Sequence, residues 1–418
     1  MRILLIHQYF LEKDDGGGSR FNEMAKTWGE QGHHITVLAG MVHYATGKKI
    51  DAYKGKYFDC QKNFYKNVDV LRCHVSEAYN VNFLGRLWAY FSFVFSSTWA
   101  GLFKIKGKYD IILVTSPPLF VGITAYMLSK FKKLPFVFEI RDLWPESAID
   151  TGVLTNKTII KFAFWFEKFI YKKASLINVL TPAFRKKLIY KKNIPKEKII
   201  FIPNAADFTL AENIAVSNFN PLEFKEKQGF KDKFVITYVG AHGVANHLIQ
   251  LVDAAEKLKD TNVVFQLIGA GMKKEELKTA VAKRKLKNVV FVDSIAKSEV
   301  FKYILASDMG ASVLKKVDTF KTIYSNKTFD YMSCKKPTLL LIDGVSRQLV
   351  ETAKCGVYAE PEDIQDIVAK VTWCLANQKE LPQMGRNGYQ YAKEYFDRTT
   401  LANEYLAHIQ MIVDKNNV

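Results

Sequence analysis

The sequence is poor in cysteine, and its few cysteines follow no recognisable pattern. The five of them are odd in number and widely scattered in a chain of 418 residues: Cys60, Cys73, Cys334, Cys355 and Cys374. This spacing argues against a disulfide framework and favours a reducing compartment. It also provides no zinc-like Cys/His pattern. Arginine runs interleaved with aromatic residues are missing as well, so no nucleic-acid-binding module is indicated.

The chain also lacks a long apolar run. None of its uninterrupted apolar segments approaches the roughly 20 residues that a membrane-spanning helix needs. Residues 1–7 are typical of a first strand, and no small-residue cleavage site of a signal peptide follows them. With 48% hydrophobic and 24% charged residues, the sequence is that of a soluble globular protein large enough for two domains. We therefore expect a cytoplasmic protein.

Acidic residues are outnumbered by basic ones, which gives a formal net charge of +18. A lysine excess of this size indicates a partner of opposite charge, such as nucleic acid, anionic lipid or a phosphorylated substrate. Because no nucleic-acid module is present, we rank lipid and phosphate first.

Short apolar segments alternate with helical patterns from the first residue onward, which is typical of an α/β fold with doubly wound parallel sheets. In the first half the expected strands are Ile3–Ile6, Ile35–Leu38, Val68–Val75, Ile111–Thr115, Phe136–Ile140, Leu176–Leu180 and Ile199–Ile202. In the second half they are Phe234–Gly240, Val263–Ile268, Val289–Val292, Met309–Leu314 and Thr338–Ile342. The periodicity fades between the halves, where Asn218, Asn220, Pro221 and Gly229 interrupt it.

We therefore predict two Rossmann-like domains that face each other across a cleft. The expected boundaries are 1–207 for the first domain, 208–232 for a linker, 233–385 for the second domain, and 386–418 for a C-terminal helix that returns to the first domain.

A glycine triplet, Gly16–Gly18, follows the first expected strand and precedes a helix over Phe21–Glu30. Ligands bind at this position in open parallel sheets, and glycine lets the backbone approach them closely. Gly17 and Gly18 are therefore candidates for contact with a bound ligand. The triplet lacks the spacing of a dinucleotide fingerprint, so a plain flexible turn is the alternative.

The segment Tyr324–Pro337 combines a helix start and a helix stop with charges between them. Ser325 or Asn326 can cap the first turn, and Pro337 ends the helix before an apolar run. The free amides of such a helix start favour an anion such as phosphate. Lys327 suits a diphosphate and Asp330, three residues on, suits a ribose diol. The alternative is a surface helix with an ordinary ion pair.

The stretch from Asn80 to Leu102 is apolar on most sides and rich in aromatic residues. Lys104, Lys106 and Lys108 follow it directly. A helix of this composition either is buried or lies in a bilayer interface, where lysines strengthen contact with anionic lipid. The candidate membrane residues are Leu84, Leu87, Trp88, Phe91, Phe95 and Trp99.

Taken together, these stretches resemble the family 4 glycosyltransferases of the GT-B type over nearly the whole chain. Within that family, the sequence is most similar to the group that adds sugars such as N-acetyl-fucosamine in O-antigen or capsule synthesis (the WbuB-like group). The motifs that carry the resemblance are Gln8–Phe10, Gly16–Arg20, Ile140–Ser147, Ile202–Asp207, Tyr238–Gly240, Ile268–Gly271 and Asn326–Met332. The most specific of them is the Arg-Asp-Leu-Trp-Pro-Glu string at 141–146.

The resemblance implies a retaining glycosyltransferase that holds a nucleotide-sugar mainly in its second domain and an acceptor mainly in its first. It favours a UDP-sugar over a GDP-sugar as donor, and a polyprenyl-diphosphate-linked saccharide as acceptor. It assigns the donor to Gly17, Gly18, Arg20, Gly240, His242, Asn246, Gly269, Ile295, Ser325, Asn326, Lys327 and Asp330. It assigns catalytic roles to Asp142, Arg141, Glu146 and Lys327; a buried Arg141–Asp142 pair that merely holds its loop is the alternative.

Two features depart from the family pattern. The first of its two usual glutamates is replaced by Thr322, and the loop after Gly240 has no arginine. Arg20, Arg141 and Lys327 are then the candidate cations for the diphosphate.

The sequence contains no Asp-x-Asp triplet, the motif with which the other large glycosyltransferase fold holds a metal ion. We therefore expect no metal and no cofactor besides the nucleotide-sugar substrate. The expected partners are this donor, a lipid-linked acceptor and the anionic inner face of the plasma membrane. A UDP-sugar 2-epimerase of the same fold and a non-catalytic sugar-nucleotide-binding protein are the alternatives, and the oligomeric state is left open.

Overall fold

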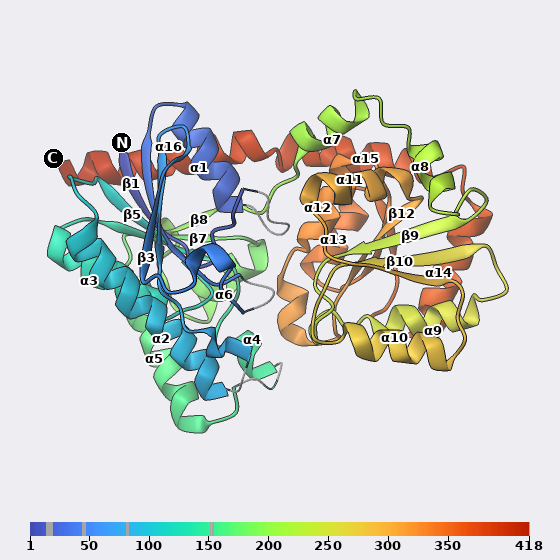
Figure 1. Cartoon of the computed structure of the whole chain (residues 1–418), viewed down its shortest axis with the longest axis horizontal. Helices are drawn as coiled ribbons and strands as arrows, with labels where there is room; N and C mark the ends of the chain where they lie inside the picture. The colour runs from blue at the N-terminus through green and yellow to red at the C-terminus, as the bar shows by residue number, and fades with distance from the viewer. Residues whose placement is uncertain (14–19, 44–46, 81–82, 151, 153, 418) are drawn as a thin grey trace. The chain divides into compact units, whose positions relative to one another are not determined.

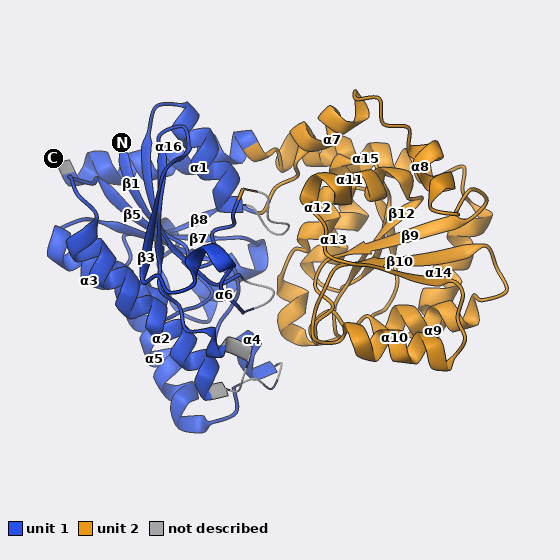
Figure 2. Cartoon of the chain, in the orientation of Figure 1, with its two compact units in different colours: residues 1–12, 19–203, 399–418 blue, residues 13–18, 204–398 orange. Residues whose placement is uncertain are grey.

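The computed structural model describes residues 1–13, 20–43, 47–80, 83–150, 152 and 154–417. Within these ranges the chain forms two compact units (Figure 2). Unit 1 contains residues 1–12, 20–203 and 399–417, and unit 2 contains Lys13 and residues 204–398. Each unit has its own sheet covered by helices on both faces (Figure 1).

The sheet of unit 1 has the strand order β3-β4-β2-β1-β5-β6-β7-β8, and all pairs except the antiparallel β3–β4 are parallel. Its strands are β1 Arg2–Ile6, β2 His34–Gly40, β3 Phe58–Tyr65, β4 Val68–Cys73, β5 Ile111–Ser116, β6 Phe136–Ile140, β7 Leu176–Val179 and β8 Ile199–Phe201. Its longer helices are α1 Arg20–Glu30, α2 Phe83–Trp99 with the π-helix η3 Ala100–Lys104, α3 Val121–Lys132, α4 Glu146–Asp150, α5 Lys157–Lys173, α6 Pro182–Tyr190 and the C-terminal α16 Arg398–Asn417. Short 3-10 turns are η1 Asp51–Tyr53, η2 Glu77–Asn80 and η4 Lys196–Lys198.

The sheet of unit 2 is parallel throughout, in the order β11-β10-β9-β12-β13-β14. Its strands are β9 Phe234–Val239, β10 Val263–Ile268, β11 Val289–Val292, β12 Met309–Val313, β13 Thr338–Leu341 and β14 Gly356–Tyr358. Its helices are α7 Phe208–Ala215, α8 Pro221–Lys227, α9 Ile249–Lys257, α10 Lys274–Lys283, α11 Lys297–Ala306, the 3-10 turn η5 Asp318–Thr322, α12 Asn326–Ser333, α13 Val345–Thr352, α14 Ile364–Ala376 and α15 Leu381–Tyr395.

These sheets confirm the predicted α/β class with two Rossmann-like halves. Every strand expected from an apolar run is present. The strands missed are β3, an edge strand with mostly half-buried or exposed residues, and the three-residue β14. Neither contains the continuous apolar run that marks a strand buried on both faces.

The expected linker over 208–232 is largely helical. Asp207 caps α7 and Asn220 caps α8, and both helices belong to unit 2. The expected C-terminal helix from residue 386 is also different, because α15 ends within unit 2 and only α16 enters unit 1. There the indole of Trp28 donates to the carbonyl of Ala402 at 2.8 Å, which ties α16 to α1.

Each sheet has one point at which the strand order reverses, and ligands of open α/β sheets bind just beyond such points. In unit 1 the reversal lies between β1 and β5, and in unit 2 between β9 and β12. The residues that follow these four strands therefore define where a site is expected.

Candidate functional site

Helix α12 begins at the reversal point of unit 2 with an uncapped first turn. Ser325 is its N-cap, but its hydroxyl donates to Ser312 Oγ at 3.3 Å and caps no amide. Within the described chain no acceptor is found for the amides of Asn326 and Lys327. The predicted helix start is thus present, and its free amides remain available to an anion.

Lys327 extends from this first turn over the backbone of Gly240, the residue that follows β9. A Cβ built at Gly240 would lie 2.7 Å from Lys327 Cε and 3.3 Å from its Nζ. The ammonium also lies 5.0 Å from the centre of the Tyr238 ring. The structure describes no hydrogen bond or ion pair for it, and burial lowers its pKa to about 8. It is a half-buried cation with no ion-pair partner among the residues that the structure describes.

Helix α12 is held in this place by one of its own residues, Tyr331, whose side chain is fully buried on the side that faces the sheet. The hydroxyl is 3.0 Å from the carbonyl of Ala311 and accepts from the amide of Val239 at 3.3 Å. Its ring occupies the space that a side chain at Gly310 would need, because a Cβ there would lie 2.3 Å from the ring. A glycine in β12 therefore allows the helix to sit directly on the sheet.

Asp330 does not pair with Lys327, so the alternative of an ordinary surface ion pair is wrong. Burial raises the pKa of its carboxyl, while Lys297 and Arg398 act in the opposite direction. These two cations also contact Asp207, at 2.5 Å and 3.3 Å respectively. Lys297 and Arg398 were not singled out from the sequence, because the contacts join segments far apart in the chain.

The other predicted donor residues of unit 2 gather at the same sheet edge. Gly240 and Gly269 lie in adjacent loops, since a Cβ at Gly269 would lie 2.0 Å from the Gly240 carbonyl oxygen. Ile295 is half-buried against a cluster that includes Ile268, Phe301 and Tyr331. Asn246 lies in the loop after Gly240, where its backbone N–H donates to the carbonyl of Gly243.

His242, in the same loop, is completely buried. Burial and the neighbouring Lys274 lower its pKa to about 4, so the imidazole is neutral at physiological pH. It therefore provides no replacement for the missing arginine. Lys274 itself was not predicted: its ammonium donates to the carbonyls of Gly269 and Val292 at 2.7 and 3.0 Å and fixes both loops.

In unit 1 the guanidinium of the predicted Arg20 already has partners. Its guanidinium pairs with the buried Glu139 at 3.0 Å and donates to the carbonyls of Ile202 and Pro203. These contacts hold β6 and the end of β8 to α1. We therefore withdraw Arg20 as a cation for the diphosphate. Gly17 and Gly18 lie outside the described residues.

The predicted catalytic residues 141–146 follow β6. Asp142 accepts from Ser147 Oγ at 2.6 Å, and burial raises the pKa of its carboxyl. Glu146 contacts the ammonium groups of Lys187 and Lys192 at 3.1 and 2.8 Å. Both acids thus have partners within unit 1, and the catalytic assignments, including Arg141, stay predictions.

His7 and Thr115, which the sequence analysis did not select, meet at the reversal point of unit 1. The imidazole Nδ1 lies 2.6 Å from Thr115 Oγ1. Burial, and next to it the charge of Arg141, lowers the pKa of His7 well below its usual value. Their signal in the sequence was their position directly at the ends of β1 and β5.

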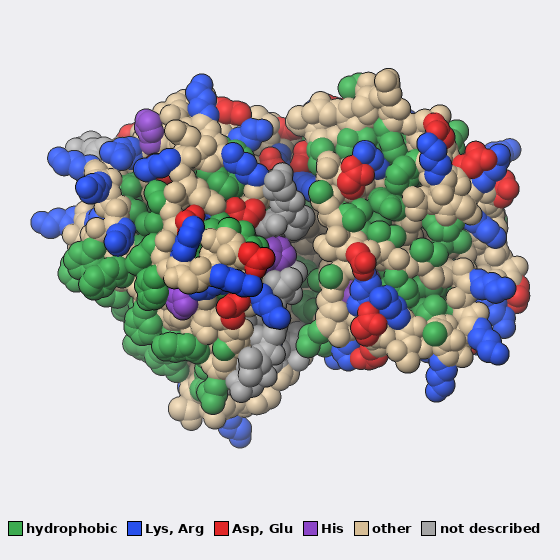
Figure 3. Space-filling model, viewed as in Figure 1, with side chains coloured by type: hydrophobic (Ala, Val, Ile, Leu, Met, Phe, Trp, Pro, Cys, Tyr) green, Lys and Arg blue, Asp and Glu red, His purple; other side chains and the backbone are tan. Residues whose placement is uncertain are grey.

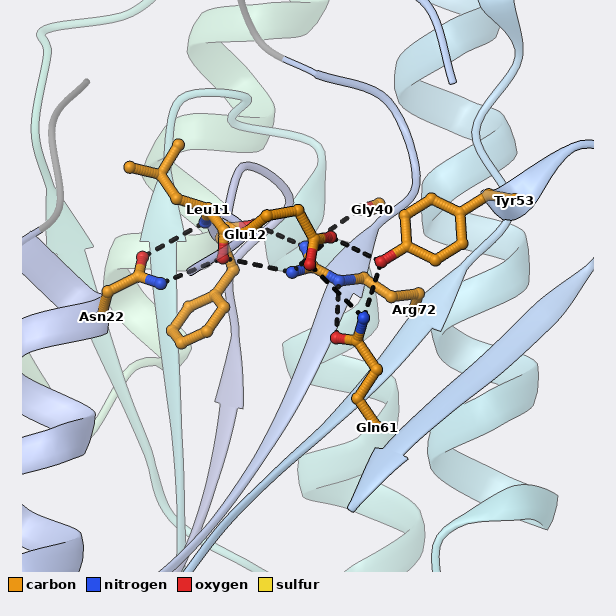
Figure 4. A network of polar contacts seen from close by, with 8 residues as sticks. Leu11, Glu12, Asn22, Gly40, Tyr53, Gln61 and Arg72 are labelled. Carbon is orange, nitrogen blue, oxygen red and sulfur yellow. Dashed lines mark hydrogen bonds and ion pairs between the residues drawn. The ribbon is translucent and has the colours of Figure 1, made fainter. Parts of the chain in front are cut away.

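A buried arginine fixes the loop after His7 (Figure 4). The guanidinium of Arg72 in β4 donates to the carbonyls of Phe10 and Leu11, and pairs with Glu12 at 2.8 Å. Glu12 also accepts from the hydroxyl of Tyr53 at 2.5 Å. The segment leading to the glycine triplet is therefore anchored by side chains from two different elements, β4 and η1.

Helix α2 is not buried as a whole. Leu84, Trp88, Phe95 and Trp99 are each more than half exposed, while Leu87 and Phe91 are half-buried. The opposite face of α2, with Ala89 and Phe93, is buried against the rest of unit 1. The alternative of a wholly buried helix is thus wrong. Among the described residues, no helix is both long and apolar enough to cross a bilayer.

Comparison with known proteins agrees with this architecture. Residues 15–205 match the family described as the glycosyl transferase 4-like domain, and residues 220–391 match the glycosyl transferases group 1. The paired parallel sheets and these matches define a glycosyltransferase of the GT-B type. Each of the two matches covers less than half of the chain, and they lie one after the other along it.

Individual relatives are distant but extend over the full length. A protein named as a colanic acid biosynthesis glycosyl transferase, WcaI of Escherichia coli strain K12, is 22% identical over 98% of this chain and 100% of its own. Anabaena HepE, crystallised with UDP-glucose, superimposes with a TM-score of 0.72 at 18% identity, covering 98% and 100% of the two chains. WaaG, a glycosyltransferase involved in lipopolysaccharide biosynthesis, gives 0.67 at 14% identity over 98% and 99%.

Proposed function

We propose that the protein transfers a sugar from a UDP-sugar to a lipid-linked saccharide during bacterial surface-polysaccharide synthesis, with retention of the anomeric configuration. The observation that carries the donor assignment is Lys327, a half-buried ammonium beside the free amides of α12 for which the described residues provide no ion pair. A diphosphate placed there satisfies both. The UDP-glucose bound to HepE and the tasks named for WcaI and WaaG support the donor and the product class.

In the proposed reaction the bond between the anomeric carbon and the diphosphate oxygen breaks as negative charge grows on the leaving group. Lys327 and the amides of α12 stabilise that charge because they are oriented before the reaction begins. The acceptor oxygen bonds to the anomeric carbon from the same face, and its proton passes to the departing diphosphate. Asp330 accepts from the ribose hydroxyls, and Ile295 contacts the base.

The sugar and the acceptor are proposed to meet at the loops after β1, β5 and β6. Arg141 provides positive charge there, and Asp142 with Glu146 orients the loop that carries it. An N-acetyl-hexosamine such as N-acetyl-fucosamine is the proposed sugar. Because the charge is met by amides and lysine, we propose that no metal ion is needed.

The test is an assay of a panel of UDP- and GDP-sugars with one lipid-linked saccharide acceptor. We expect UDP release that depends on acceptor and persists in EDTA. Release of UDP with an epimerised sugar from donor alone would instead identify an epimerase. Tight donor binding with no turnover across the acceptor panel would identify a binding protein, and activity lost in EDTA and restored by manganese would reject the metal-free mechanism.

A further inference from the structure

Exposed aromatic residues concentrate on one face of unit 1. They form a stripe along α2 and η3, in which Trp88, Phe95, Trp99 and Phe103 repeat at intervals of four or seven residues and are each more than half exposed. Three of the six tryptophans of the chain, Trp88, Trp99 and Trp165, are exposed by 55–60%. Large apolar side chains seldom gather in solvent without a binding function.

Helix α5 contributes to this face, although the sequence analysis assigned no membrane role to its aromatic residues. Phe162 and Trp165 are 46% and 60% exposed, and their ring centres are 5.7 Å apart. Lys161 and Lys168 flank Trp165 at helical spacing and are exposed as well. The outward side of α5 thus combines rings and ammonium groups, as helices at a bilayer interface do.

Helix α3 joins the two aromatic helices. The hydroxyl oxygens of Ser97 in α2 and Thr124 in α3 are 3.0 Å apart. The ring centres of Tyr126 in α3 and Phe169 in α5 are 4.9 Å apart. Phe131, at the end of α3, is 68% exposed. Figure 3 shows hydrophobic side chains gathered over α2 and α3 at the lower left. The three helices form one continuous surface, which we call the α2–α3–α5 surface.

The lysines of this region show no ion pair with any acid that the structure describes. Eleven of them lie on these helices or in the segments directly next to them in the chain: Lys104, Lys106, Lys108, Lys130, Lys132, Lys133, Lys157, Lys161, Lys168, Lys172 and Lys173. Surface lysines of unit 2, in contrast, commonly pair with acids, as Lys273 does with Glu276 at 2.5 Å. Between residues 78 and 141 the only acids are Asp110 and the buried Glu139.

We propose that the α2–α3–α5 surface binds the surface of an anionic phospholipid bilayer, with aromatic rings entering the interface and lysines contacting the headgroups. Aromatic rings favour the interface, and each lysine near an anionic surface strengthens binding. A soluble protein partner would need acidic residues to match these lysines. It would not explain why exposed tryptophans and lysines occur together on both α2–η3 and α5. The inference deepens the proposed function, because a lipid-linked acceptor is present only at a membrane.

The test is co-sedimentation of the full chain with vesicles of phosphatidylcholine and phosphatidylglycerol, and with vesicles of phosphatidylcholine alone. We expect binding to the anionic vesicles that falls with salt, and at least about tenfold weaker binding to the neutral ones. The double variant Phe162→Ser/Trp165→Ser should weaken anionic binding by about tenfold or more. Lys161→Gln/Lys168→Gln should reduce it by a similar factor while leaving the aromatic residues in place.

The matched control is Leu222→Ser/Met272→Ser, two exposed apolar residues of unit 2 at 77% and 79% exposure. This variant should bind vesicles like the unchanged protein. Equal binding by the α5 variants and the unchanged protein would overturn the proposal, as would a dimer in solution that dissociates when Phe162 and Trp165 are replaced. UDP binding is measured in parallel by calorimetry. If neither the unchanged protein nor any variant binds UDP, the proposed function is rejected, and vesicle binding still tests the proposal for the α2–α3–α5 surface.

Discussion

The end of the Lys327 side chain occupies the space above the backbone of Gly240, where a side chain at that position would begin. Gly240 has a φ of 138°, a conformation that residues with a side chain rarely adopt. One residue thus provides a cation at the head of α12, and the other provides the open backbone over which that cation extends.

Gly240→Ala should therefore displace Lys327. The added methyl would lie 2.7 Å from Lys327 Cε and would strain the backbone. We expect UDP to bind at least about tenfold more weakly, as befits the loss of one charge-assisted contact. Isothermal calorimetry measures the effect, and Gly243→Ala, where only one atom lies within 4 Å of the new methyl, is the control. Unchanged affinity in Gly240→Ala would place the diphosphate elsewhere.

Lys327→Met should stabilise the protein while it weakens donor binding. Burial of the ammonium lowers its pKa to about 8, so holding it charged at pH 7 costs on the order of 1–3 kcal/mol. Methionine fills the same space without that cost. Thermal unfolding at pH 7 should move up by a few degrees, whereas UDP affinity should fall by at least about tenfold. Lys278→Met, at a surface ion pair with Glu275, should change neither appreciably.

The same group predicts a pH dependence. Below pH 8 Lys327 is charged in the folded and the unfolded chain, and the cost of burial is fully present. Between about pH 8 and pH 10.5, the ordinary pKa of lysine, the unfolded chain binds more protons than the folded chain. The contribution of Lys327 to the free energy of unfolding therefore rises with pH in this range. UDP, which requires the charged form, should bind more weakly above pH 8, by up to about tenfold per pH unit. Calorimetry near pH 8 in buffers of different ionisation enthalpy should show proton uptake on binding. Affinity that is flat from pH 7 to 10, or a profile unchanged in Lys327→Met, would contradict this.

Gly310→Ala should destabilise unit 2 through Tyr331. The new methyl would lie 2.3 Å from the ring, and overpacking of this kind costs about 1–3 kcal/mol or more. Tyr331→Phe tests the other half of the contact, because it keeps the ring and removes the hydroxyl that contacts Ala311 and Val239. Its cost should be about 1–3 kcal/mol. Urea denaturation measures both, and a neutral Gly310→Ala would show that α12 is not seated as described.

Arg72→Met should destabilise unit 1 by about 2–4 kcal/mol, because it leaves Glu12 without its buried cation and two carbonyls without a donor. Lys62→Met removes a cation from an exposed pair with Asp69 and should cost about 1 kcal/mol or less. Equal effects of the two substitutions on the urea midpoint would reject an anchoring role for Arg72.

The sequence alone determined the sheets and the position of α12. Apolar runs such as Ile3–Ile6 and Ile111–Val114 are buried on both faces, and that local property is readable from one stretch of chain. Asn326, Pro337 and the charges between them likewise identified the helix and its ends. Strand β3 was not predicted, because an edge strand needs no apolar run.

Tertiary structure alone decided what each charged or aromatic side chain meets. The sequence presents Arg20 and Lys327 alike as candidate cations for the diphosphate. Arg20 pairs with Glu139 and donates to two carbonyls, whereas Lys327 has no ion pair with any acid that the structure describes. Trp28 and Trp165 both lie in helices, but Trp28 is buried under α16 and Trp165 is exposed beside lysines. Secondary structure follows from local periodicity, whereas burial and pairing depend on segments up to hundreds of residues away. The partners of a side chain, and hence its chemistry, are therefore fixed only when the chain has folded.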